Sequence, residues 1–275
     1  MKKKPIIISI LVAALIIAAI VGTMLYRRDS NGKPFKASLN HSKVMMTPNW
    51  DATVKLTANK GATYQVLNKD NKVVQGKHAT TDGKATIKLT KVGDYTIVAK
   101  SDNGHVSKKL PVKVSHYQAQ LNKWTNAVGP LKFKITSVDY RLMSKSDRDK
   151  PDTSMIDEIF DQLNDHYYQV QVNYVVENTG NKAVNPQYTM WLPESDDNQE
   201  FSVQTPTVDG AGIDSIIGTA AIGPKSKRSG NVIMISNNKF SVQNMKFSID
   251  EVLGNNGSHI SKGGSPSLNK RQNNL

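Results

Sequence analysis

The sequence predicts a mainly β protein, in which one apolar N-terminal helix precedes two β-sandwich domains and the second domain carries a short inserted helix. Three observations predict this class. Residues 6–25 carry no charge, residues 35–115 and 116–253 alternate apolar and polar side chains in short runs, and turn-forming residues separate these runs. Such period-two alternation places one row of side chains in a core and the other in water.

Residues 6–25 are long enough to cross a bilayer, because twenty helical residues span about 30 Å. Basic residues lie on both sides of this run, at 2–4 before it and at Arg27 and Arg28 after it. The bias of positive charge toward the cytoplasmic side predicts a cytoplasmic N-terminus and an extracellular body. Residues 1–28 are therefore predicted to form a cytoplasmic stub and a transmembrane signal anchor in the cell membrane.

The same segment is open to a second interpretation as a cleaved signal peptide, since basic, apolar and small residues follow in that order. The apolar run is long for that purpose, and Val21-Gly22-Thr23 is a poor cleavage site, so we favour a retained anchor over secretion. The chain has no cysteine, which excludes a lipid-modified cysteine anchor, disulfides and thiol chemistry.

Charge separates the two predicted domains. Residues 35–115 contain 14 Lys, no Arg and 5 acidic residues, a net charge of +9, whereas 116–253 contain 13 basic and 17 acidic residues, a net charge of −4. For an external protein this asymmetry favours an anionic cell-wall polymer or an envelope protein as the partner, and not nucleic acid. We weight the alternative interpretation, that outward lysines only provide solubility and discourage edge pairing, above a dedicated polyanion site.

The first domain, residues 35–115, reads as short strands, for example at 53–57 and 86–90. Within it, the stretch Val92-Gly93-Asp94-Tyr95-Thr96-Ile97-Val98-Ala99 resembles the penultimate strand of bacterial immunoglobulin-like domains, where a glycine ends a turn and a tyrosine begins an inward-alternating strand. The resemblance implies an immunoglobulin-like sandwich that serves as a spacer or adhesive module. Fold alone does not assign a function.

The second domain, residues 116–253, has its clearest strand at 168–176, and further strands are expected at 231–235 and 245–249. The order of its elements resembles a secreted β-sandwich family of Gram-positive bacteria whose function is uncharacterised. The resemblance rests on three stretches, Val175–Gly180, Ile222–Gly230 and Met245–Ile249. It implies a second immunoglobulin-like sandwich and transfers no catalytic residue.

Three segments depart from the strand pattern. Residues 152–166 have helical spacing, with Asp157, Asp161 and Asp165 along one side that we interpret as a solvated face and not as a cation site. Residues 206–223 read as a long apolar loop, either folded against the sandwich or serving as a contact surface. The tail 254–275 is rich in Gly, Ser and Asn and is predicted to be disordered.

No catalytic, cofactor-binding or metal-binding residues are predicted. The six histidines form no pair at zinc-ligand spacing, and no phosphate-binding glycine loop or nucleophile elbow occurs. Each of the three tryptophans is open to two interpretations, a core or inter-domain contact or a binding platform, and we favour the first for each because tryptophan is highly buried on average. They are Trp50, Trp124 and Trp191. The candidate contact surface combines one tryptophan with three isoleucines: Trp191, Ile213, Ile216 and Ile217.

The sequence thus predicts a non-catalytic, membrane-anchored cell-surface protein that binds or presents a module in the cell envelope. The alternative is an accessory, sensor or immunity-type subunit that acts on another membrane protein. Neither the ligand nor the oligomeric state is predicted.

Overall fold

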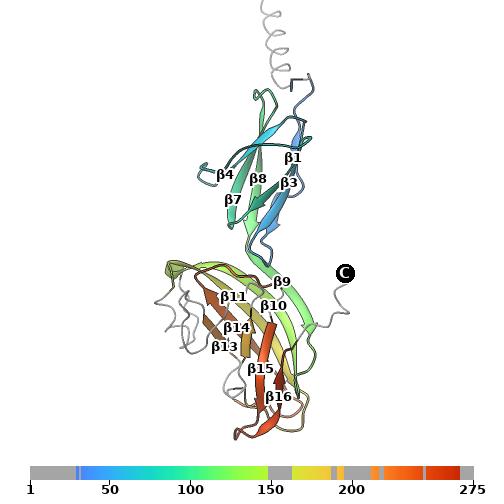
Figure 1. Ribbon diagram of the computed structural model, residues 1–275, viewed down its shortest axis with the longest axis vertical. Helices are drawn as coiled ribbons and strands as arrows, with labels where there is room; N and C mark the ends of the chain where they lie inside the picture. The colour runs from blue at the N-terminus through green and yellow to red at the C-terminus, as the bar shows by residue number, and fades with distance from the viewer. Residues whose placement is uncertain are drawn as a thin grey trace, which may run out of the picture. The chain divides into compact units, whose positions relative to one another are not determined.

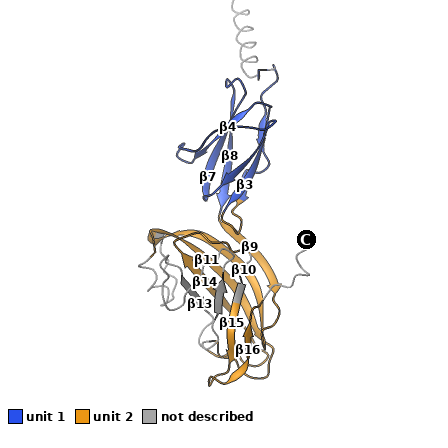
Figure 2. Cartoon of the chain, viewed as in Figure 1, with its two compact units in different colours: residues 1–44, 51–115 blue, residues 45–50, 116–275 orange. Residues whose placement is uncertain are grey.

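The computed structural model describes residues 29–30, 32–147, 163–186, 191–194, 212–216, 220–243 and 246–266, with the backbone alone at 191–194, 212–216 and 246–247. The chain divides into two compact units (Figure 2). Unit 1 comprises Met1–Val44 and Asp51–Ser115, and unit 2 comprises Met45–Trp50 and His116–Leu275. Regular structure in the described residues is strand apart from one short 3-10 helix, Lys145–Asp147, which confirms a mainly β protein.

Unit 1 contains two sheets, with strand orders β1-β3-β6 and β2-β8-β7-β4-β5 (Figure 1). The strands of the first sheet are β1 (Ala37–Leu39), β3 (Ala52–Ala58) and β6 (Lys84–Leu89). Those of the second sheet are β2 (Lys43–Met45), β4 (Thr63–Asn68), β5 (Val73–Ala79), β7 (Gly93–Lys100) and β8 (Ser107–Ser115).

Side-chain alternation explains why these segments of unit 1 are strands. In β3, Val54 and Leu56 are buried, whereas Thr53, Lys55 and Thr57 between and after them are exposed. The partner strand β6 repeats this pattern in register, and so does β8 in the other sheet. The predicted two-sided strands of residues 35–115 are therefore present, with one apolar row in the core and one polar row in water.

Two turns of unit 1 depend on particular residues. Gly83 has φ 78°, and a Cβ there would lie 2.2 Å from the carbonyl oxygen of Ala58, so only glycine fits between β3 and β6. At the start of β7, the Tyr95 hydroxyl donates a 2.8 Å hydrogen bond to the carbonyl oxygen of Lys91. This bond ties the strand to the turn that precedes it.

Unit 2 contains a five-stranded sheet of order β13-β14-β11-β10-β9 and a three-stranded sheet of order β12-β15-β16, with antiparallel neighbours throughout. The strands of the larger sheet are β9 (Tyr117–Trp124), β10 (Leu131–Ser144), β11 (His166–Asn178), β13 (Gly212–Ile216) and β14 (Lys227–Ser236). Those of the smaller sheet are β12 (Trp191–Glu194), β15 (Lys246–Leu253) and β16 (His259–Gly264).

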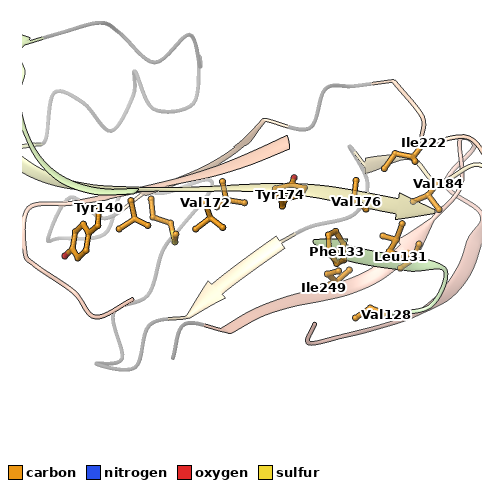
Figure 3. Packing of buried hydrophobic residues seen from close by; sticks show 14 of the residues in the cluster. Val128, Leu131, Phe133, Tyr140, Val172, Tyr174, Val176, Val184, Ile222 and Ile249 are labelled. Carbon is orange, nitrogen blue, oxygen red and sulfur yellow. The ribbon is translucent and has the colours of Figure 1, made fainter. Parts of the chain in front are cut away.

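The core of unit 2 lies along the apolar face of β10 and β11 (Figure 3). Val170, Val172, Tyr174 and Val176 of β11 are all buried, as the alternation over 168–176 predicts. Buried residues from outside the large sheet complete this cluster, among them Ile249 of β15. Since β11 is paired on both sides, it is the central strand around which the unit is built.

Four aromatic residues at one end of this core form what we call the aromatic cluster: Trp50, Tyr140, Tyr168 and Phe240. The ring centroid of Trp50 lies 4.6 Å from that of Tyr140 and 5.2 Å from that of Tyr168. The Tyr140 hydroxyl donates to the Phe240 carbonyl oxygen at 2.8 Å and accepts from the Phe240 amide at 2.9 Å. Trp50 is only 2% exposed, so it is a core residue and not a binding platform.

The sequence position of Trp50 makes unit 2 discontinuous. Trp50 is the last residue of the segment Met45–Trp50, which belongs to unit 2. The residues directly before and after this segment in the sequence belong to unit 1. The Trp50 amide donates to the carbonyl oxygen of Thr47, and the φ of Trp50, 57°, lies in the left-handed region that a bulky side chain rarely adopts. The Val242 amide donates to the Pro48 carbonyl oxygen, which joins this segment to the chain after Phe240.

Three segments differ from what the sequence suggests or are only partly described. Most of the predicted helix 152–166 lies outside the described residues, and its last residue is already the first of β11. The expected loop 206–223 contains the strand β13, and the expected disordered tail 254–275 contains β16. Backbone pairing with β15 and packing of Ile260 against the core stabilise β16, neither of which its Gly- and Ser-rich sequence reveals.

We predict that Trp50→Ala lowers the free energy of unfolding of unit 2 by about 3–5 kcal/mol, the usual cost of removing a buried tryptophan. Thermal and denaturant unfolding of the full chain measure this loss. Val73→Ala in β5 is the matched control, because Val73 is 58% exposed and its truncation should change stability by less than about 0.5 kcal/mol. Equal effects of the two substitutions would show that Trp50 is not a core residue.

Candidate functional site

The predicted contact residues fall on two different sheets. Trp191 begins β12 and is paired with Ile249 of β15, whereas Ile213 and Ile216 lie in β13, at the edge of the five-stranded sheet. Positions 213 and 216 are an odd number of residues apart, so they fall on opposite sides of a pleated strand. Ile217 lies outside the described residues. The backbone therefore does not unite the three described positions, 191, 213 and 216, on one sheet face.

A charged surface of unit 1 lies on the outward side of β3 and β6. We call it the lysine–threonine face, and it consists of Thr53, Lys55, Thr57, Lys84, Thr86 and Lys88. Each lysine is paired in register with a threonine on the neighbouring strand, so cations and hydroxyls alternate across the sheet. All six residues are exposed. The face is thus flat, hydroxyl-rich and positively charged.

A second cationic feature of unit 1 is a groove of about 370 Å³ in the five-stranded sheet. Lys43 of β2, Lys69 of the β4–β5 turn and Lys113 of β8 line it together with one acid, Asp94 of β7. The other lining residues are Ser42, Tyr95, Thr96, Pro111 and Val112. We call this feature the lysine groove. Sequence reasoning missed it because its three lysines are far apart in the chain, and only the order of strands brings them together.

Few of the unit 1 lysines are neutralised by neighbouring acids. Among the described residues, ion pairs join Lys60 to Asp82 at 3.2 Å and Lys88 to Asp51 at 2.6 Å. The remaining lysines of 35–115 have no ion-pair partner within the described part of the chain. Most of the positive charge of unit 1 is therefore directed into solvent.

Unit 2 has a different polar centre, around Asp139 in β10. Arg141 donates to both carboxylate oxygens of Asp139, at 2.9 and 2.5 Å, and the Gln118 amide donates to one of them at 3.1 Å. His116 Nε2 lies 3.4 Å from Asp139 Oδ1 without meeting hydrogen-bond geometry. Burial acts to raise the pKa of Asp139, but the bonds from Arg141 and Gln118 and the charges of Arg141 and His116 outweigh it and hold this pKa below its ordinary value.

The described residues offer no group of three or more histidine, aspartate or glutamate side chains that could hold a metal ion. Of the predicted aspartate stripe, Asp157 and Asp161 lie outside the described residues, and Asp165 is exposed before β11. Nor does the described part of the chain contain a helix long and apolar enough to cross a membrane. Residues 6–25, the predicted anchor, are not among the described residues.

Comparison with known proteins gives no family for the chain, since no family model and no curated protein matches it. Among solved structures it is similar to a conserved hypothetical protein from Bacillus anthracis, with 11% identity over 55% of this chain and 96% of that chain and a TM-score of 0.29. It is also similar to a marsupial T cell receptor, with 8% identity over 84% of this chain and 99% of that one and a TM-score of 0.22. Scores this low carry no argument about fold or function.

We predict that Asp139 stabilises unit 2 at neutral pH and loses this effect in acid. A carboxyl group whose pKa is lowered by folding stabilises the protein above its unfolded pKa of about 3.9, and the stabilisation disappears as the pH falls through the folded pKa. Asp139→Asn should therefore be less stable than the unsubstituted chain by about 1 kcal/mol at pH 7.

Denaturant unfolding of both proteins from about pH 7 to about pH 2 tests this, because the difference should shrink below about pH 4. Asp70→Asn, at an exposed turn of unit 1, is the control and should show no such convergence. A stability difference between Asp139→Asn and the unsubstituted chain that stays constant with pH would contradict a stabilising role of the ionised Asp139 carboxylate.

Proposed function

We propose that the chain is a non-catalytic, membrane-anchored cell-surface protein that holds anionic polymer of the cell envelope through unit 1. The observation that carries this proposal is the outward positive charge of that unit, on the lysine–threonine face and in the lysine groove. Exposed cations attract a polyanion over long range without a shaped pocket, and Lys55 and Lys84 of this face have no ion-pair partner among the described residues, whereas Lys88 is paired with Asp51. Threonine hydroxyls beside these lysines donate hydrogen bonds to phosphate or carboxylate oxygens.

Binding of this kind is weak and selects charge more than structure. Residues 35–115 contain no arginine, so the bidentate contacts by which guanidinium groups recognise phosphate are absent from unit 1. Lysine is a point charge on a flexible stem, and a flat array of lysines tolerates many arrangements of anionic groups. A repeating polymer suits such a surface better than a small anion, because many weak contacts add up along one chain.

We infer in addition that unit 1 is immunoglobulin-like. With β1, β3 and β6 taken as strands A, B and E, and β8, β7, β4 and β5 taken as strands G, F, C and C′, each set lies in one sheet, as in the immunoglobulin arrangement. The short strand β2 is added at the edge beside β8. The Tyr95 hydroxyl bonded to Lys91 matches the tyrosine corner at the start of strand F in that fold. The immunoglobulin-like assignment of unit 2 and its kinship with a Gram-positive family rest on the sequence resemblance and stay predictions.

We predict that neutralising the lysine–threonine face weakens binding to linear inorganic polyphosphate, used as the probe polyanion. The full chain in phosphatidylcholine nanodiscs should be retained on immobilised polyphosphate at low salt and released as salt rises, because the screening length falls from about 10 Å at 0.1 M to about 3 Å at 1 M. The triple variant Lys55→Gln, Lys84→Gln and Lys88→Gln should bind about tenfold more weakly.

A triple variant with the same loss of charge on unit 2 is the matched control for this experiment. It carries Lys182→Gln, Lys239→Gln and Lys262→Gln, all at exposed positions, and should lose much less affinity. Equal losses in the two triple variants would show that net charge alone matters. Absence of retention at low salt would leave the lysines as a solubility device and overturn the proposal.

We predict that protease added to intact, wall-stripped cells digests the chain after Arg28 and spares the anchor at 6–25. The reason is the excess of positive charge before the apolar run, which favours a cytoplasmic N-terminus. Immunoblotting with antibodies against each unit measures the digestion. A body that is fully protected would contradict the proposed topology, and a mature N-terminus between Gly22 and Arg28 would indicate secretion in place of anchoring.

A further inference from the structure

The outward face of the five-stranded sheet in unit 2 carries an unusual set of side chains. Its central row crosses four neighbouring strands, β9, β10, β11 and β14 (Figure 1). In this row Gln120 is opposite Ser137, Ser137 is opposite Asn173, and Asn173 is opposite Asn231. The next row contains Gln118, Asp139 and Gln171 in the same order of strands. We call these seven residues the amide face.

The amides of this face are connected but not saturated. Gln171 Nε2 donates to Asn173 Oδ1 at 3.0 Å, and Asn173 Nδ2 donates to the Ser137 hydroxyl at 2.9 Å. Gln120 is exposed and makes no side-chain hydrogen bond among the described residues. Asn231 Oδ1 is buried without a hydrogen-bond partner in the described part of the chain. The network therefore fixes the orientation of the central amides and leaves accessible hydrogen-bonding capacity at the Gln120 end, since the unsatisfied oxygen of Asn231 is buried.

Strand preference does not explain this composition. Asparagine is depleted in β strands, and β-branched residues fit a half-exposed sheet surface better. The corresponding outward face of unit 1 follows the usual rule, with threonines and lysines on β3 and β6. A set of residues that breaks a local rule without a gain in packing is the kind expected at a functional surface.

Backbone irregularities bring an aromatic side chain to the same face. The pairing of β9, β10 and β11 shifts register between Ile135 and Ser137, so that Lys134 and Ser137 both face outward. Trp124, opposite Lys134, is consequently adjacent to the central row of the amide face. Its indole is half-buried, and the ammonium groups of Lys132 and Lys227 lie 5.3 and 5.5 Å from the ring centroid. Such bulges re-aim side chains and are frequent beside binding sites.

We propose that the amide face, together with Trp124, binds a polysaccharide chain through its hydroxyl groups. An amide offers both a donor and an acceptor, which is what neighbouring sugar hydroxyls require, and it does so without a charge that would demand a counter-ion. The half-buried indole beside the amides adds contact area for the C–H groups of a sugar ring, which would compete with the two ammonium groups that lie over this ring. The row across four strands presents these groups in a line, which suits an extended chain better than a compact ligand.

Direct binding to defined tetrasaccharides tests the proposal. The probes are β-1,4-linked tetramers of glucose, N-acetylglucosamine, mannose and xylose, presented to the full chain in phosphatidylcholine nanodiscs and measured by ligand-observed NMR and calorimetry. At least one tetramer should bind, and its affinity should be unchanged between about 0.1 M and about 1 M salt, because no ion pair is involved. Binding that disappears at high salt would assign the effect to the lysines of unit 1 instead.

Two substitutions locate the site. Gln120→Ala removes an exposed side chain without a described hydrogen bond, so it should leave the thermal melt unchanged and weaken binding about three- to tenfold. Trp124→Ala should weaken it about tenfold or more. Gln65→Ala, in β4 of unit 1, is the matched control and should bind as the unsubstituted chain does. Failure of all four tetramers to bind, or binding that both substitutions leave intact, would overturn the proposal.

Discussion

The structure of unit 2 depends on the burial of one tryptophan, which comes from a segment that interrupts unit 1 in the sequence. Trp50 is held in the left-handed backbone region, which costs a non-glycine residue about 1–2 kcal/mol. Burying an indole of about 150–250 Å² contributes about 4–6 kcal/mol at about 25 cal/mol per Å², which offsets that cost. The hydrogen bonds between Tyr140 and Phe240 then fix the other side of the cluster. The aromatic cluster thus closes one end of the core that lies along β10 and β11.

In both units apolar and polar side chains alternate along the strands, but the side chains on the outward faces of the sheets differ in charge. In unit 1 the outward positions of β3 and β6 hold lysine and threonine, and 14 lysines against 5 acids leave residues 35–115 at +9. In unit 2 the outward positions of β9 and β11 include four amides, Gln118, Gln120, Gln171 and Asn173, which lie beside Ser137 and the paired carboxylate of Asp139 on β10. A charged sheet face attracts at a distance, whereas an amide face acts only on contact. The two proposed binding activities are therefore separable by salt.

Strands whose apolar and polar side chains alternate strictly could be predicted from the sequence. Features that depend on which strands pair, and in which register, could not. The buried rows of β3 and β11 follow directly from Val54 and Leu56 and from Val170 to Val176. No local signal, however, connects Trp50 with Tyr140, or gathers Lys43, Lys69 and Lys113 at one groove, since strand order decides both. The strand β16 has no alternation to recognise, because pairing with β15 and not its own composition orders it. The amide face could not be predicted from the sequence, because the register of four strands, including its bulges, brings these residues together.

The discontinuity of unit 2 also has a consequence for biogenesis. Synthesis proceeds from the N-terminus, so Trp50 emerges long before Tyr140, Tyr168 or Phe240, and the strands of unit 1 can pair while this indole still has no pocket. Until Tyr140 and Tyr168 have been made, the nascent chain carries an exposed aromatic side chain, the type of surface that chaperones engage and that promotes aggregation. A chain that stops before residue 140 would keep this surface permanently. Quality-control proteases would then have a means to distinguish truncated from finished molecules, even where unit 1 itself has folded.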